Sequence, residues 1–189
     1  MKKQRVVFLD RDGVINRYPG DRDYVKSWDE FEFLPRVKPA LKRLNEKGFR
    51  VFIISNQAGV SKGIYTQEAL DTITGNMLSD LEAFGINIAR VFYCIHRQED
   101  DCACRKPRTG NIEKALMMLR KEGIEPELRK SYFIGDTIRD IETGRAAGLN
   151  TILVFSGKEK ADNKENWVIT PGHTADDLSG AVDLIINAG

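Results

Sequence analysis

The sequence has no long hydrophobic run and no excess of charge of either sign. Its first apolar run, Val6-Val7-Phe8-Leu9, ends after four residues at Asp10. That is too short for a signal peptide, and no stretch approaches the ~20 apolar residues that span a bilayer. The 29 Lys and Arg and the 28 Asp and Glu residues are scattered, so no surface for nucleic acid or membranes is indicated. We therefore expect a cytoplasmic monomer with a single domain, residues 1–189.

Cysteine is also scarce, and its distribution is not that of a disulfide framework. The three cysteines of the chain fall between positions 94 and 104, unlike those of a disulfide-stapled secreted domain. Cys94, His96, Cys102 and Cys104 offer three thiolates and an imidazole in two close pairs. Four such ligands close a tetrahedral, structural Zn²⁺ site. The alternative is three buried free thiols and a loop histidine.

Short apolar runs alternate with longer amphipathic stretches, which indicates the α/β class. Strands are predicted at Val6–Leu9, Val51–Ile54, Val91–Tyr93, Tyr132–Ile134 and Thr151–Phe155, and helices at Val37–Lys47, Gln67–Phe84, Asn111–Glu122, Ile138–Ala147 and Ala175–Ile186. Continuous apolar runs are typical of strands covered on both faces, and strand–helix alternation requires parallel crossovers. We expect a three-layer, doubly wound parallel sheet without a large cap, whose ligands bind beyond the carboxyl ends of the strands.

Three aspartates follow predicted strands at that edge. Asp10 and Asp12 come directly after the first strand, and Asp136 follows a later strand, Tyr132–Ile134. Clustered carboxylates repel one another unless a cation neutralises them, and hard oxygen ligands suit Mg²⁺ bound together with a phosphate. Helix capping or turn formation is the alternative for each aspartate alone. Because two predicted strands end in this way, a site for Mg²⁺ and phosphate is favoured over capping or turn formation.

Two further side chains suit a phosphoryl group. Ser55 ends the second predicted strand and precedes a turn at Gly59, where glycine keeps the backbone permissive. A small hydroxyl near backbone N–H groups can hold phosphoryl oxygens, although such a segment is also ordinary turn sequence. Lys106 adds a compact cation that offsets phosphate charge. A lone lysine is usually solvated, but Lys106 closely follows Cys104, so a closed zinc loop would hold it in place.

Four motifs resemble those of the haloacid dehalogenase superfamily of phosphohydrolases. They are Asp10-x-Asp12-Gly13, Ser55-Asn56, Arg105-Lys106-Pro107 and Gly135-Asp136-x-x-x-Asp140, and the likeness covers residues 5 to 157. The resemblance implies the fold of that superfamily and a Mg²⁺-dependent phosphatase that works through an aspartyl-phosphate intermediate.

The resemblance also implies a role for each residue. Asp10 would be the nucleophile, and Asp12 the acid that protonates the leaving oxygen and then the base that activates water. Ser55 and Lys106 would hold the transferring phosphoryl group, and Asp140 would orient Lys106 or the metal shell. The expected substrate contacts are Asn56, Gln57 and Arg105, and the expected Mg²⁺ ligands are Asp10, Asp12 through its backbone carbonyl, and Asp136.

The cysteine loop that leads into Cys104–Pro107 resembles the branch of heptose bisphosphate phosphatases and histidinol-phosphatases. Phe31–Phe33, Asn56–Gly63 and Ser156–Lys158 are similar to D-glycero-D-manno-heptose 1,7-bisphosphate 7-phosphatases. The short interval between the two zinc-ligand pairs and the presence of Thr137 match the histidinol-phosphate branch instead. The likeness implies hydrolysis of the 7-phosphate of the heptose bisphosphate, with histidinol phosphate as the alternative substrate. A catalytically silent binding module is the alternative of another class, although every catalytic residue of the motifs is present.

Overall fold

The computed structural model describes residues 2–188 and confirms the α/β class. Six strands form one parallel sheet in the order β4-β3-β2-β6-β7-β8. Their bounds are β2 Val6–Leu9, β3 Arg50–Asn56, β4 Ile88–Cys94, β6 Tyr132–Gly135, β7 Asn150–Val154 and β8 His173–Ala175. A second, two-stranded parallel sheet pairs β1 Lys2–Gln4 with β5 Ile124–Pro126.

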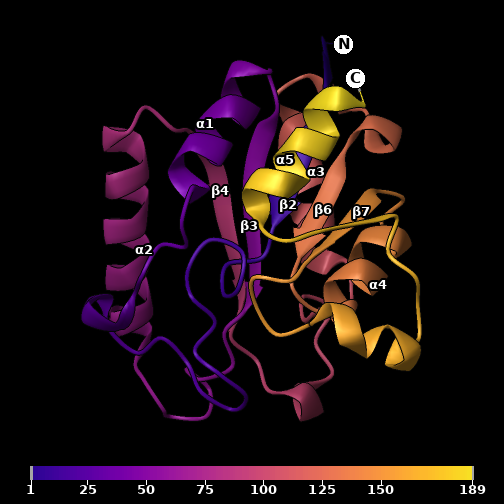
Figure 1. Ribbon diagram of the computed structural model, residues 1–189. Coiled ribbons are helices and arrows are strands. Elements are labelled where there is room, and N and C mark those ends of the chain that lie inside the picture. The colour runs from indigo at the N-terminus through magenta and orange to yellow at the C-terminus, as the bar shows by residue number, and fades with distance from the viewer. Residues whose placement is uncertain (1, 189) are drawn as a thin grey trace.

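Five helices cover the two faces of the sheet (Figure 1). One face carries α1 Val37–Glu46, α2 Gln67–Ala83 and α5 Leu178–Asn187, and the other carries α3 Gly110–Lys121 and α4 Ile138–Ala146. Alternate residues of a strand point to opposite faces, so Val7 and Leu9 of β2 pack with the first group of helices and Val6 and Phe8 with the second. Both faces of β2 are buried, which explains its continuous apolar sequence.

Every predicted strand and helix is present; β2 has the predicted bounds, and the others differ at one or both ends. The strands β1, β5 and β8 were not predicted, because three residues are too few to show a periodic pattern. The last helix begins later than expected. Ala175 ends β8, and the side chain of Asp177 caps α5 by accepting a hydrogen bond from the Gly180 N–H. Short 3₁₀ helices lie at Trp28–Glu30, Gln98–Asp100, Leu128–Lys130 and Ala161–Asn166.

The register of the central strands brings the predicted site residues to one edge. Leu9 of β2 is paired with Ile53 of β3 on one side and with Ile134 of β6 on the other. Asp10 directly follows β2, Ser55 is the penultimate residue of β3, and Asp136 directly follows β6, so all three reach the same edge of the sheet. In Figure 1 the loops that follow β2 and β3 lie at the lower end of the molecule, away from both termini.

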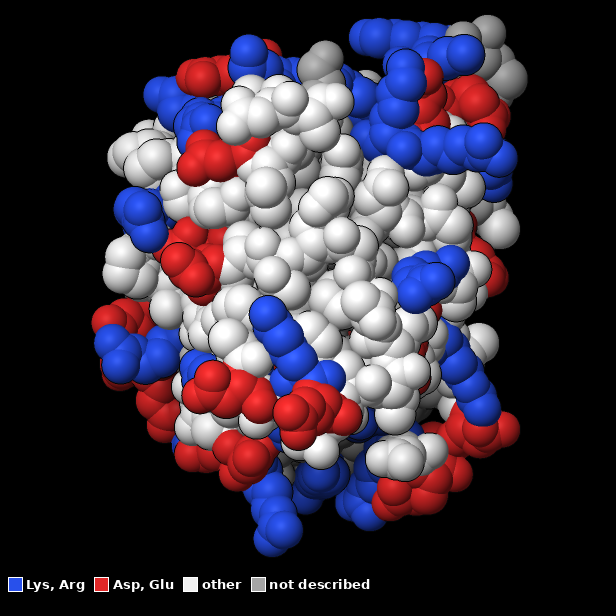
Figure 2. Space-filling model, turned by 45° about the vertical axis from the view of Figure 1, so that its right-hand side comes forward, with Lys and Arg blue, Asp and Glu red and all other residues white. Residues whose placement is uncertain are grey.

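The rest of the described chain adds short connections around this edge. Between residues 2 and 188 no large cap is inserted, and no helix is both long and apolar enough to cross a membrane. Charged side chains of both signs are interspersed on the face shown in Figure 2, in keeping with the formal net charge of +1.

Phe8 provides a test of the core that supports this edge. Its ring is fully buried and stacks on Phe52 and Phe133, at centroid distances of 5.5 and 6.4 Å. Replacing Phe8 by Ala should lower the free energy of unfolding by about 3–5 kcal/mol, measured by urea denaturation followed by circular dichroism. The exposed Met117, replaced by Ala as a control, should change it by less than about 0.5 kcal/mol. Equal effects of the two substitutions would contradict this packing.

Candidate active site

Asp10 lies in a buried position just beyond the carboxyl end of β2. It is 8% exposed, and its Oδ1 accepts a hydrogen bond of 2.7 Å from the backbone N–H of Arg11. Its Oδ2 lies 2.8 Å from Nζ of Lys106. Burial raises the pKa of Asp10 to about 6, although the charge of Lys106 acts in the opposite direction. The carboxylate therefore faces the site with one cation directly beside it.

Lys106 is buried between two carboxylates. Its Nζ also lies 2.6 Å from Oδ1 of Asp140, whose Oδ2 accepts hydrogen bonds from the backbone N–H and the hydroxyl of Thr137, at 3.0 and 2.6 Å. Burial disfavours the charged amine, but Asp10 and Asp140 outweigh it and hold the pKa of Lys106 above its ordinary value. Asn56 fixes the Lys106 backbone, since its amide accepts from the Lys106 N–H at 3.1 Å and donates to the Lys106 carbonyl at 3.2 Å. Both the backbone and the ammonium group of Lys106 are thus held in place.

Asp136 occupies a slot between two glycines. It is 1% exposed, and its Oδ2 accepts a hydrogen bond of 2.8 Å from the backbone N–H of Lys158. A Cβ atom at Gly13 or Gly157 would lie 2.3 or 2.0 Å from this oxygen, and Gly13 also has a φ of +80°. Burial, followed by the charges of Asp10 and Asp140, raises the pKa of Asp136 well above its ordinary value. These two positions therefore require glycine if the carboxylate is to stay in place.

The cluster of three buried carboxylates fits a magnesium ion with Asp10 and Asp136 as ligands, since both oxygens of Asp140 already contact Lys106 or Thr137. One oxygen of each of Asp10, Asp136 and Asp140 lies within 4.8 Å of the others. Lys106 is the cation in direct contact with this group, so its single positive charge faces three carboxylates. Hard oxygen donors with an uncompensated negative charge are the ligands that suit Mg²⁺.

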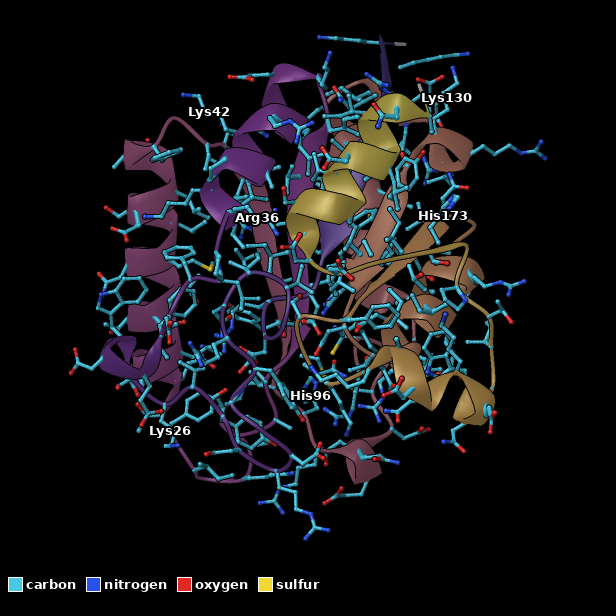
Figure 3. All side chains as sticks on the ribbon, viewed as in Figure 1. Lys26, Arg36, Lys42, His96, Lys130 and His173 are labelled. Atoms are coloured by element: carbon cyan, nitrogen blue, oxygen red, sulfur yellow. The ribbon has the colours of Figure 1, made fainter. Side chains whose placement is uncertain are left out.

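The predicted zinc ligands also converge. Cys94 ends β4, and its Sγ lies 3.7 Å from Nδ1 of His96 and 3.5 Å from Sγ of Cys102. Cys104 lies 3.3 Å from His96 Nδ1 and 3.5 Å from Cys102 Sγ. Ligands with bonds of about 2.0–2.3 Å in a tetrahedron are spaced by roughly these distances, so the set fits Zn²⁺. His96 lies below the sheet in Figure 3, at the opposite end of the molecule from Lys42 and Lys130.

A cavity of about 210 Å³ opens over the buried carboxylates. The predicted site residues that line it are Asp10, Asp12, Ser55, Asn56, Arg105, Lys106 and Asp136. Gln57, a predicted substrate contact, does not line this cavity and is fully buried. Of the two loops near the site, residues 18–24 form one wall, whereas the loop after Gly59 does not reach it.

Several residues of the site were not found from the sequence. Arg139 and Lys158 line the cavity, and Thr137 braces Asp140. Arg11 is fully buried, and its Nη2 lies 2.9 Å from Oδ1 of Asp12. The position of Arg11 between two aspartates is the one signal that could have identified it, since an arginine is rarely buried without a carboxylate partner.

The sequence of this chain is similar to those of known phosphatases. Residues 103–181 match the family model described as HAD-hydrolase-like. A D-glycero-D-manno-heptose-1,7-bisphosphate 7-phosphatase of Chlorobaculum tepidum is 39% identical over 189 residues, which covers 96% of this chain and 94% of the relative. A D-glycero-alpha-D-manno-heptose-1,7-bisphosphate 7-phosphatase of Photorhabdus laumondii is 33% identical, with 89% and 92% covered.

A solved structure extends the likeness to three dimensions. The crystal structure of D,D-heptose 1,7-bisphosphate phosphatase from B. bronchiseptica, complexed with magnesium and phosphate, has a TM-score of 0.86 and 28% sequence identity. The match covers 98% of this chain and all of that one, 100%. The sequence identity to full-length relatives and the shared fold lead to one conclusion. This chain belongs to the heptose bisphosphate phosphatase family of the haloacid dehalogenase superfamily.

Proposed function

We propose that this chain is a Mg²⁺-dependent phosphatase that removes the 7-phosphate of D-glycero-D-manno-heptose 1,7-bisphosphate through an aspartyl-phosphate on Asp10. The observation that carries the proposal is the contact of Lys106 with both Asp10 and Asp140 at the floor of the cavity, with Asp136 beside them. A silent binding module would not need to keep a buried nucleophile, a buried cation and a third carboxylate together.

In the first half-reaction a carboxylate oxygen of Asp10 attacks phosphorus, and the bond between phosphorus and the sugar oxygen breaks. Asp12, which lines the same cavity, gives its proton to that leaving oxygen. Ser55 and Lys106 hold the transferring phosphoryl oxygens, and the lysine offsets their charge. Asp10, Asp136 and the backbone carbonyl of Asp12 would hold Mg²⁺, which would offset negative charge on the phosphoryl group.

In the second half-reaction water attacks phosphorus and the bond to Asp10 breaks. Asp12, now a carboxylate, takes the proton from that water, so the same side chain serves as acid and then as base. Phosphate leaves, and Asp10 returns to its ionised form. The division into two steps replaces one difficult displacement by two easier ones.

The Cys94, His96, Cys102 and Cys104 cluster is proposed to hold a structural Zn²⁺. Its role would be to fix the segment that carries Arg105 and Lys106, because this segment follows Cys104 directly. Arg105 lines the cavity and its guanidinium donates to the backbone carbonyl of His96 at 3.2 Å. A guanidinium in this position suits a second phosphate or sugar hydroxyls on the substrate.

Histidinol phosphate is the second candidate substrate. The observation that favours it is Thr137, whose side chain braces Asp140 and supplies no cation to the cavity. The names of the relatives favour the heptose bisphosphate. A cytoplasmic location and a monomeric state remain predictions.

The nucleophile is tested by replacing Asp10 with Asn, which removes the attacking carboxylate but keeps its size. Release of phosphate in the presence of Mg²⁺ should fall below about 10⁻³ of the wild-type rate, because the residue that forms the covalent intermediate is lost. Asp162→Asn, at an exposed position on a 3₁₀ helix, is the matched control and should keep full activity. An active Asp10→Asn enzyme would refute the proposed mechanism.

The substrate is tested by steady-state assays of both esters. We expect kcat/KM to be higher for the heptose bisphosphate, with phosphate release from its 7-position. A preference of ~100-fold or more for histidinol phosphate, about 2.7 kcal/mol of transition-state discrimination, would end the heptose assignment.

The zinc site is tested by metal analysis of purified, reduced protein. We expect one zinc per chain, and Cys102→Ala should lose it and lower kcat/KM by about 10-fold or more, because the support of the Lys106 segment is removed. Ala103→Ser, in the same loop, keeps all four ligands and should keep the metal. Wild-type protein without zinc would contradict the assignment.

A further inference from the structure

Gln57 faces the interior of the protein although both of its neighbours face the cavity. Asn56 and Ala58 line the cavity, whereas Gln57 does not and is 0% exposed. A fully buried amide needs hydrogen-bond partners within the protein. The partners of this amide assign it a task other than binding substrate.

The amide of Gln57 connects Asp12 to Tyr65. Its Nε2 donates to Oδ2 of Asp12 at 2.8 Å and to Oγ of Ser55 at 3.2 Å, and its Oε1 accepts from the hydroxyl of Tyr65 at 2.6 Å. The NH₂ group of Gln57 thus faces Asp12 and its amide carbonyl faces Tyr65. The hydrogen bond from the Tyr65 hydroxyl holds the side chain of Gln57 in the orientation that presents its NH₂ group to Asp12.

The other oxygen of Asp12 is held by two more residues. Oδ1 accepts from Nε and Nη2 of Arg11, at 3.1 and 2.9 Å, and from Nδ2 of Asn16 at 2.9 Å. Arg11 and Asn16 are fully buried, while 17% of the Asp12 side chain is exposed. The carboxylate thus has its plane fixed by buried donors on both oxygens and keeps one side open to the cavity.

Tyr65 is itself wedged in position. It is 7% exposed, its ring lies 5.9 Å from that of Tyr24, and a Cβ atom at Gly59 would lie 2.2 Å from its Cε1. The sequence suggested that Gly59 keeps a turn permissive, but Gly59 is not among the glycines with positive φ. Glycine is needed there because the tyrosine ring occupies the space of a side chain.

We propose that Gln57 and Tyr65 are positioning residues for the proton shuttle Asp12, and that Gln57 is not a substrate contact. Tyr65 orients the amide of Gln57, and the amide sets the plane of the Asp12 carboxylate. The inference rests on the proposed function, because it takes Asp12 to be the group that protonates the leaving oxygen.

Two substrates with different leaving groups distinguish a positioning role of Gln57 and Tyr65 from a general effect on folding. A sugar alkoxide needs a proton as it leaves, whereas p-nitrophenolate leaves readily without one. For a phosphatase with a covalent intermediate, kcat/KM reports the steps up to loss of the leaving group. A misplaced Asp12 should therefore lower kcat/KM for a sugar phosphate and spare it for p-nitrophenyl phosphate.

The experiment measures kcat/KM for the heptose bisphosphate and for p-nitrophenyl phosphate with Mg²⁺. Gln57→Leu should lower kcat/KM for the sugar phosphate by ~30-fold. Tyr65→Phe, which deletes one hydroxyl, should lower it by ~5-fold. Both losses are smaller than the whole contribution of general acid catalysis, about 10²–10⁴-fold, because only part of that contribution is lost. Values for p-nitrophenyl phosphate should stay within about 2-fold of wild type. Tyr132→Phe deletes the hydroxyl of a half-buried tyrosine in β6, away from the cavity, and should leave both substrates unaffected.

Equal losses on both esters would show a structural role and overturn the proposal, and so would no loss on either. If Gln57→Leu does not fold, as judged by circular dichroism, Tyr65→Phe alone decides. Failure of the proposed function is seen separately, in the wild type. A wild-type chain that does not cleave the heptose bisphosphate refutes that substrate, and the same ratio is then measured with any alkyl phosphate it cleaves, such as glycerol 2-phosphate.

Discussion

The buried ion pairs of Lys106 are the interaction on which the rest of the site depends. Three carboxylates meet at one edge of the sheet, and Lys106 contacts two of them, Asp10 and Asp140. Removal of one partner from a buried pair typically costs about 3–5 kcal/mol, because a charge is left uncompensated in a medium that cannot solvate it. Lys106 offsets part of the negative charge of the carboxylate cluster in the folded protein, and it is also the cation proposed to contact the phosphoryl group. Stability and chemistry thus depend on the same atom, Nζ of Lys106.

The chain holds this lysine from three directions. Asn56, at the end of β3, brackets the backbone of Lys106 with two hydrogen bonds. Thr137 holds Asp140, and Asp140 holds the lysine side chain. The Cys/His cluster gathers the loop that precedes it. Since β2, β3 and β6 are neighbours in the sheet, these supports come from a rigid frame that the parallel register fixes.

The parts of this arrangement that the sequence predicts are those with a local signal. Five apolar runs and four motifs were sufficient for five of the six strands of the main sheet, for their parallel direction and for the convergence of Asp10, Ser55 and Asp136, because parallel strands end at one edge. Side-chain direction within a turn has no such signal. Gln57 lies between two residues that face the cavity, and only the fold decides that it points inward. The need for glycine at Gly59 and Gly157 was equally hidden, since it arises from contacts that only the fold creates: with Tyr65 in the same loop as Gly59, and with Asp136, which follows another strand than Gly157.

Residues 18–24, which form one wall of the cavity, are held in place by other interactions than the residues at the floor of the cavity. The floor consists of buried charges that depend on one another, whereas the wall is held by exposed contacts such as those of Asp21 with Tyr18 and Lys158. Exposed ion pairs of this kind contribute little to stability. During divergence of such enzymes the residues of this wall can be replaced with little effect on the chemistry beneath it, apart from Tyr24, which packs against Tyr65. One catalytic floor can therefore serve a lineage whose members recognise different phosphate esters.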